Sequence, residues 1–98
     1  MLDLASATHQ QFEAALNQPF RLGAEAFSLE LLRVDKRGAF DPEVHKRQAF
    51  SLIFRGPCEP VLPQRIYPLA SETLGALELF LVPIGPDKEG MRYEAVFT

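Results

Sequence analysis

The chain has 98 residues, of which 47% are hydrophobic and 23% charged, a composition typical of one globular domain and not of a disordered or fibrous chain. Its formal net charge of −3 repels phosphate backbones and anionic lipid, so we expect neither nucleic acid nor a membrane as a partner. A single cysteine excludes an intramolecular disulfide and favours a reducing compartment, the cytoplasm. The sequence predicts no secretory signal and no membrane-spanning segment, because no apolar stretch is long enough for either.

One helix is predicted near the start of the chain, over residues 9–17. Thr8 is followed three residues later by Gln11, a capping-box pair that satisfies backbone N–H groups at a helix start. Apolar residues then recur at helical spacing, and Asn17 and Pro19 end the pattern. The helix therefore has one narrow apolar stripe with which to dock on the rest of the domain.

After Pro19 the sequence alternates between apolar and polar residues with period two, which is typical of strands with one buried face. The predicted strands cover about residues 20–22, 27–35, 49–55, 65–70, 76–84 and 91–97. The alternation changes parity at Leu31–Leu32, which predicts a β-bulge or a strand that leaves one sheet for another. Pro68 cannot donate to a neighbouring strand, so we expect a sheet edge or a bulge there. The fifth strand is apolar on both faces, which predicts a central or doubly covered strand.

These elements predict a single domain over residues 1–98 that is mainly β, or α+β by element count. Six antiparallel strands form either a small, partly open barrel, which we favour, or a two-layer sandwich, with one short N-terminal helix. Residues 36–47 are polar and predict a long exposed connection. Residues 56–63 contain three prolines and predict a stiff, unpaired crossing between the third and fourth strands.

Four segments carry a family resemblance: FRGP at 54–57, LPQ at 62–64, LFLVPIGP at 79–86 and YEAVF at 93–97. Together with QPF at 18–20, they make the chain similar to a family of small bacterial domains of about this length with no established function. The resemblance implies a short, free-standing, soluble protein, and some members lie near phage-tail-like proteins. Gly is common in that family where this chain has Arg65, and His is common near Glu72, so no site that uses those positions is carried over.

Catalytic chemistry has weak support in the sequence. A nucleophilic Cys58 needs a neighbouring base or cation, and the adjacent Glu59 has the opposite effect, so an incidental cysteine is favoured. His9, His45 and Cys58 lack the close spacing of zinc ligands. We therefore predict no catalytic residue, no cofactor and no metal.

One pair of carboxylates, Glu78 and Glu94, lies on the outward parity of strands that we expect to pair. Two opposed carboxylates can raise each other's pKa, as an acid–base pair requires. Surface ion pairs with Arg55 or Arg92 are nevertheless the favoured interpretation.

Three residues are candidate contacts for a partner or ligand: Phe40, Arg55 and Tyr67. Phe40 is an aromatic residue in a polar loop, so it either folds back onto the core or contacts a partner. Arg55 ends a strand before Gly56, where its guanidinium either binds the protein's own carbonyl or carboxylate groups, the favoured interpretation, or holds a ligand carboxylate.

Basic residues flank the same loop, but acidic residues alternate with them, which favours a solvated loop of mixed charge over an anion site. The basic residues are Lys36, Arg37, His45, Lys46 and Arg47.

The sequence thus predicts a non-enzymatic protein-interaction or assembly domain, an accessory of a larger bacterial or phage-tail-like assembly, that binds a protein partner or self-associates. The alternative is a small-ligand-binding barrel whose mouth is lined by Arg55, Tyr67 and the loop of Phe40. An enzyme that uses Cys58 or the carboxylate pair comes last.

Overall fold

The computed structural model describes residues 1–23 and 28–98. Its elements are α1 (His9–Glu13), β1 (Pro19–Leu22), β2 (Ser28–Lys36), β3 (Phe50–Gly56), β4 (Arg65–Ser71), β5 (Gly75–Pro86) and β6 (Met91–Phe97). The predicted start of the second strand, at Phe27, lies outside the described residues. The prediction of a mainly β fold with one short N-terminal helix is confirmed.

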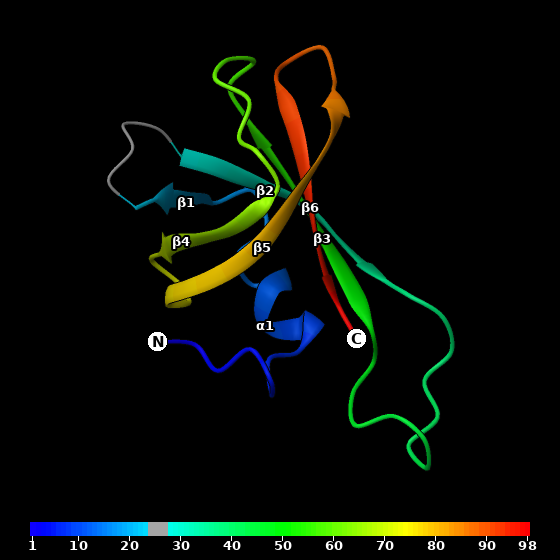
Figure 1. Ribbon diagram of the computed structural model, residues 1–98. Coiled ribbons are helices and arrows are strands. Elements are labelled where there is room, and N and C mark those ends of the chain that lie inside the picture. Colours follow the sequence, from blue (N-terminus) through cyan, green and yellow to red (C-terminus); the bar gives the residue numbers. More distant parts are fainter. Residues whose placement is uncertain (24–27) are drawn as a thin grey trace.

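The six strands form a closed antiparallel barrel in the order β1-β2-β3-β6-β5-β4 (Figure 1). The predicted barrel is therefore correct, but the sheet is neither partly open nor split into two layers. Closure comes from β1 and β4, which pair from Leu22↔Leu69 to Phe20↔Ser71. This pairing gives each strand two neighbours among the described residues, although some strands pair on both sides over only part of their length.

Two bulges bend the barrel. The register of β2 against β3 shifts between Leu31 and Arg33, which confirms the bulge predicted from the parity change. A second shift, between Pro83 and Gly85, lies in the pairing of β5 with β6. The predicted end of the fifth strand at residue 84 is wrong, because this bulge lets β5 continue to Pro86 although both prolines lack a backbone donor.

Two expectations about strand position need correction. Pro68 is not on an edge strand, since β4 pairs with both β1 and β5. It directly precedes Leu69, the residue at which the pairing of β4 with β1 ends. β5 lies between β4 and β6, so its predicted central position is confirmed, but it is not covered on both faces. Leu77, Leu79 and Leu81 face the core, while Phe80 on the outer face is 51% exposed.

The helix is shorter than predicted. α1 begins with the expected capping box, in which Thr8 accepts from the Gln11 N–H, but it ends at Glu13 and not at residue 17. The chain then tightens into turns whose hydrogen bonds span three residues, and Asn17 takes a positive φ of 64°. This conformation directs the chain into β1, and the Asn17 N–H bonds the Leu31 carbonyl of β2.

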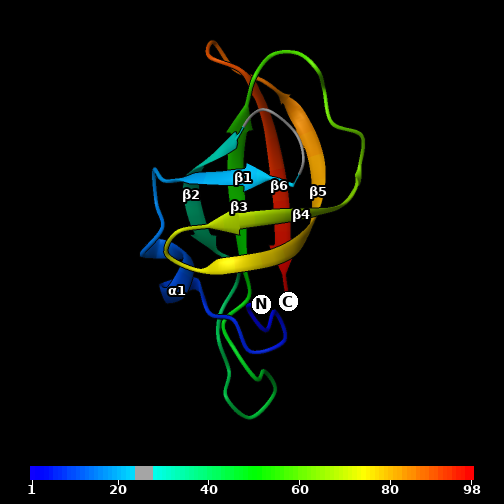
Figure 2. The same cartoon turned by 90° about the vertical axis from the view of Figure 1, so that its left-hand side faces the viewer.

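Side chains fill the barrel, and its two ends differ. At one end, the Phe12 ring of α1 packs 5.8 Å from the ring of Phe50 and 5.4 Å from that of Phe97. Both termini and the loop between β2 and β3 lie at this end (Figures 1 and 2). The crossing between β3 and β4 and the turn between β5 and β6 lie at the other end. There the buried hydroxyl of Tyr93 accepts the Leu62 N–H at 2.9 Å.

Candidate functional site

Arg55 lies near the end of β3, and its guanidinium is occupied by the protein. Its Nε donates to Asp87 Oδ2 at 2.9 Å, and its Nη1 lies 3.0 Å from Glu89 Oε2 and 3.7 Å from Glu30 Oε1. The cross-strand neighbour of Arg55 on β6 is Arg92, so the carboxylates also offset the repulsion between two adjacent cations. Arg55 therefore binds strand and turn carboxylates, as the favoured interpretation expected, and joins β2, β3 and the β5–β6 turn.

This network shifts the pKa of two of its members. The hydrogen bond from the Glu89 backbone N–H is the largest cause that lowers the pKa of Asp87, and the bond from Arg55 acts in the same direction. The hydrogen bond to Asp87 raises the pKa of Arg55 further above its already high value. Both shifts favour the charged forms, so the ion pair holds the turn near neutral pH.

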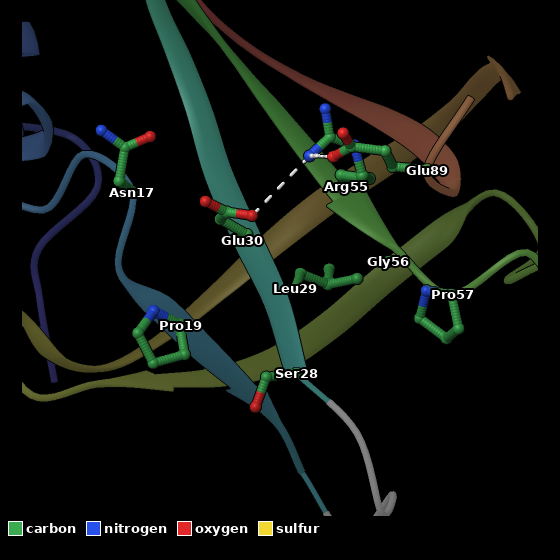
Figure 3. A pocket seen from close by; sticks show the side chains of 9 residues that line it. All are labelled: Asn17, Pro19, Ser28, Leu29, Glu30, Arg55, Gly56, Pro57 and Glu89. Atoms are coloured by element: carbon green, nitrogen blue, oxygen red, sulfur yellow. Dashed lines mark ion pairs between the residues drawn. The ribbon is translucent and has the colours of Figure 1, made fainter. Parts of the chain in front are cut away.

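A shallow concavity of about 390 Å³ lies beside Arg55, bordered by Glu30 of β2 and Glu89 of the turn (Figure 3). Both carboxylates point toward the guanidinium. Three carboxylates contact the guanidinium of Arg55, and they outnumber Arg55 and its neighbour Arg92, so the cluster is net negative. An anionic ligand would have to displace Glu89 or Asp87 before it could reach Arg55.

Tyr67 lies in β4 with its ring in the core. Its hydroxyl donates to the Pro63 carbonyl in the β3–β4 crossing, and the Arg65 guanidinium carbon lies 5.1 Å from the centre of its ring. Both polar and aromatic surfaces of Tyr67 are thus engaged by the chain itself, and the residue anchors the crossing.

Phe40 lies in the loop between β2 and β3, residues 37–49, which we call the β2–β3 loop. Its side chain is 44% exposed and does not join the core cluster, so it does not fold back onto the core. Its only aromatic neighbour among the described residues is His45, whose ring centre lies 6.3 Å away. Val44 of the same loop is 73% exposed. The tip of the β2–β3 loop therefore presents two apolar side chains to solvent.

Hydrogen bonds within the β2–β3 loop fix its shape. The Arg37 N–H donates to the Ala49 carbonyl at 2.8 Å and closes its base. At the tip, the Asp41 carbonyl accepts from Val44 and His45, and the Asp41 N–H donates to His45 Nδ1 at 3.1 Å. The loop is thus an ordered projection, visible below the barrel in Figures 1 and 2.

The structure does not bring the three predicted contact residues together. Arg55 lies at the crossing end of the barrel and the loop of Phe40 at the opposite end, and each of the three lines a different concavity. The expectation of one mouth lined by all three is therefore wrong, because it assumed that two loops at opposite ends of the strands meet.

Sequence reasoning missed the role of Arg47. Its Nη1 donates to the carbonyls of Leu4 and Ala7, both at 2.7 Å, and its Nε donates to the Thr98 carbonyl at 3.1 Å. Its guanidinium also lies 5.3 Å from the centre of the Phe97 ring. Arg47 thus ties the N-terminal segment to the end of β6, a long-range role that no local sequence signal indicates.

The candidate catalytic groups lie apart. Cys58 is exposed in the β3–β4 crossing. Glu78 lies opposite Pro68, whereas Glu94 lies opposite Val82 and Ile53 and pairs with Arg37 at 3.8 Å, so the two carboxylates are not neighbours. The strands that carry Glu78 and Glu94 pair as expected, but their register offsets the two carboxylates. The favoured ion pairs with Arg55 or Arg92 are wrong, since the partner of Glu94 is Arg37 and no ion pair of Glu78 occurs among the described residues.

The described part of the chain lacks two further features. In residues 1–23 and 28–98, no three His, Cys, Asp or Glu side chains come together as metal ligands would. Within the same residues, no helix has the length and apolar character to cross a bilayer.

Comparison with known proteins supports the family resemblance seen in the sequence. No curated protein and no solved structure gives a significant match. A family model does match, and it covers nearly the whole chain, including α1 and all six strands. The chain therefore belongs to the family described as a domain of unknown function (DUF6916), whose model matches residues 7–97.

Proposed function

We propose that this barrel is a non-enzymatic protein-interaction module, an accessory of a larger assembly, and that the β2–β3 loop is its contact surface. The observation that carries this proposal is the tip of the loop. It is held in shape by its own hydrogen bonds, yet it leaves Phe40 and Val44 in solvent.

An ordered loop suits binding because little conformational entropy remains to be lost when a partner docks. Exposed aromatic and aliphatic side chains supply the apolar area. Burial of the exposed parts of Phe40 and Val44 would contribute on the order of 2–5 kcal/mol at ~25 cal/mol per Å². That range is typical of the few central residues that dominate a protein interface.

Closure of the barrel limits one common mode of association. Each strand has two neighbours among the described residues, so a partner strand could add only where a strand pairs on one side, as at residues 95–97 of β6. Side chains of a projecting loop are then the natural contact, and a flat or grooved partner surface can receive them.

Two observations weigh against the ligand-binding alternative. Large side chains such as Phe54 and Tyr93 fill the barrel interior, and the guanidinium of Arg55 already has three carboxylate partners. The exposed position of Cys58 and the separation of Glu78 from Glu94 weigh against an enzyme.

The test compares two variants that remove similar exposed apolar surface. Phe40→Ser/Val44→Ser changes the loop, and Ile66→Ser/Phe80→Ser changes a cross-strand pair on the outer face of β4 and β5, where the side chains are 61% and 51% exposed. Light scattering over a concentration series measures self-association, and quantitative affinity capture from the source cells measures partner binding.

We expect the loop variant to lose the association, or at least about tenfold in affinity, which corresponds to ~1.4 kcal/mol. The sheet-face variant should keep it. Equal loss in both variants, loss in the sheet-face variant alone, or a strict monomer that captures nothing would each contradict the proposal.

A further inference from the structure

A second concavity, of about 450 Å³, lies where the start of α1, the end of β2 and the β2–β3 loop meet. Three of its lining residues are cations, namely Lys36, Lys46 and Arg47, and none is a carboxylate. The sequence places Asp41 and Glu43 among these basic residues, but neither acid lines the concavity. The structure thus separates charges that the sequence intermixes.

The two lysines of this concavity have no carboxylate partner in the described part of the chain. No ion pair among residues 1–23 and 28–98 includes Lys36 or Lys46. Arg47 is held by backbone carbonyls, through its Nε and Nη1. Glu13 of α1 contacts the ring of His9, which lines the concavity, and Glu94 pairs with Arg37.

The donors favour a phosphoryl group over a carboxylate. Main-chain oxygens already occupy Nε and Nη1 of Arg47, so the charge contacts left for a ligand are mainly the two lysines. A phosphoryl group carries up to two negative charges and a carboxylate only one, so two cations favour the phosphoryl group. The two lysine ammonium groups are compact point charges that suit the several oxygens of a phosphate. Thr8 also lines the concavity, and because its Oγ1 accepts the Gln11 N–H, its hydroxyl proton is left to donate.

We propose that this concavity is a binding site for a small phosphate ester or diphosphate, with Lys36 and Lys46 as its main charge contacts. The exposed ring of Phe40 borders the same concavity and offers an apolar surface to the organic part of such a ligand. This site is distinct from the cluster around Arg55, where carboxylates outnumber the cation.

The test uses inorganic pyrophosphate as the probe and two-dimensional NMR of the backbone amides as the readout, at low ionic strength. We expect the amide chemical shifts of residues 8–10, 36 and 46–48 to change with pyrophosphate concentration and to reach saturation. Lys36→Gln and Lys46→Gln should each weaken binding about fivefold, the factor expected when one close charge pair in water is lost. Lys88→Gln, at the opposite end of the barrel, removes the same charge and should change the affinity little.

Several results would overturn the site. They are an equal loss in Lys88→Gln, shifts centred away from the concavity, binding of glutarate as tight as that of pyrophosphate, or no saturation at millimolar probe. Since Val44 does not line the concavity, Val44→Ser separates this proposal from the interaction role. That variant should keep pyrophosphate binding even where it loses partner binding.

Discussion

Tyr93→Phe tests how the β3–β4 crossing is held to the barrel. The substitution keeps the buried ring and removes only the hydroxyl that accepts the Leu62 N–H at 2.9 Å. That N–H has no other hydrogen-bond partner among the described residues. A buried backbone donor left without a partner costs about 1–3 kcal/mol. In a domain of this size, ~2 kcal/mol corresponds to a melting temperature lower by about 8–16 °C.

Tyr67→Phe is the matched comparison, because it removes the other hydroxyl that reaches the crossing. It leaves the carbonyl of Pro63, an exposed residue, which water can satisfy, so we expect a loss of only about 0.5–1.5 kcal/mol. Urea unfolding of both variants measures the difference, with an unchanged dependence on denaturant concentration as evidence that the folded state is intact. If Tyr93→Phe costs no more than Tyr67→Phe, the assignment of the Leu62 anchor is wrong.

Three further predictions concern the crossing end of the barrel. The pKa of Asp87 is lowered in the folded state, so its contribution is present above its unfolded pKa of about 3.9 and is lost as the pH falls through the lower folded value. Urea midpoints of the wild type should therefore exceed those of Asp87→Asn at neutral pH and converge with them in acid; a gap independent of pH would contradict the ion pair with Arg55. Gly90→Ala should destabilise the fold by about 1–3 kcal/mol in the same assay, because a Cβ at Gly90 would lie 2.0 Å from the Gly56 carbonyl oxygen; an unchanged midpoint would show that the β5–β6 turn yields easily. Cys58→Ser should change the free energy of unfolding by no more than about 0.5 kcal/mol, as expected for an exposed side chain. A larger loss of stability would reveal a structural contact.

Local pattern predicted much of this fold. The alternation of apolar and polar residues located all six strands, and the parity change at Leu31–Leu32 located the bulge of β2. Both features depend on residues that are close together in the sequence, so a local pattern is enough to predict them. Closure of the barrel was not predictable in the same way. It depends on β1 pairing with β4, whose partner residues Leu22 and Leu69 are far apart in the sequence.

The errors at element ends have a similar origin. Tertiary hydrogen bonds ended α1 early, since the Asn17 N–H pairs with Leu31 of β2 and the preceding turns tighten to reach it. A bulge that local propensity does not predict carried β5 through Pro83. In both cases a contact from another element outweighed the preference of the segment itself.

The candidate site was predictable only in part. The sequence drew attention to Phe40 because an aromatic residue in a polar loop is unusual, and to Arg55 because it ends a strand before a Gly-Pro turn. It did not indicate that Asp87 and Glu89 surround Arg55, since that depends on the β5–β6 turn folding back beside β3. Nor could it separate Lys36 and Lys46 from the acids beside them.

The most direct test of the interaction role is a hydrogen-exchange footprint, measured with and without the captured partner or across the self-association transition. The β2–β3 loop offers suitable reporters, because the amides of Val44 and His45 are hydrogen-bonded within the loop and such bonds slow exchange. The proposal predicts that exchange slows at residues 37–49 and stays unchanged on the outer face of β4 and β5. Slower exchange around Ile66 and Phe80, with the loop unaffected, would contradict it.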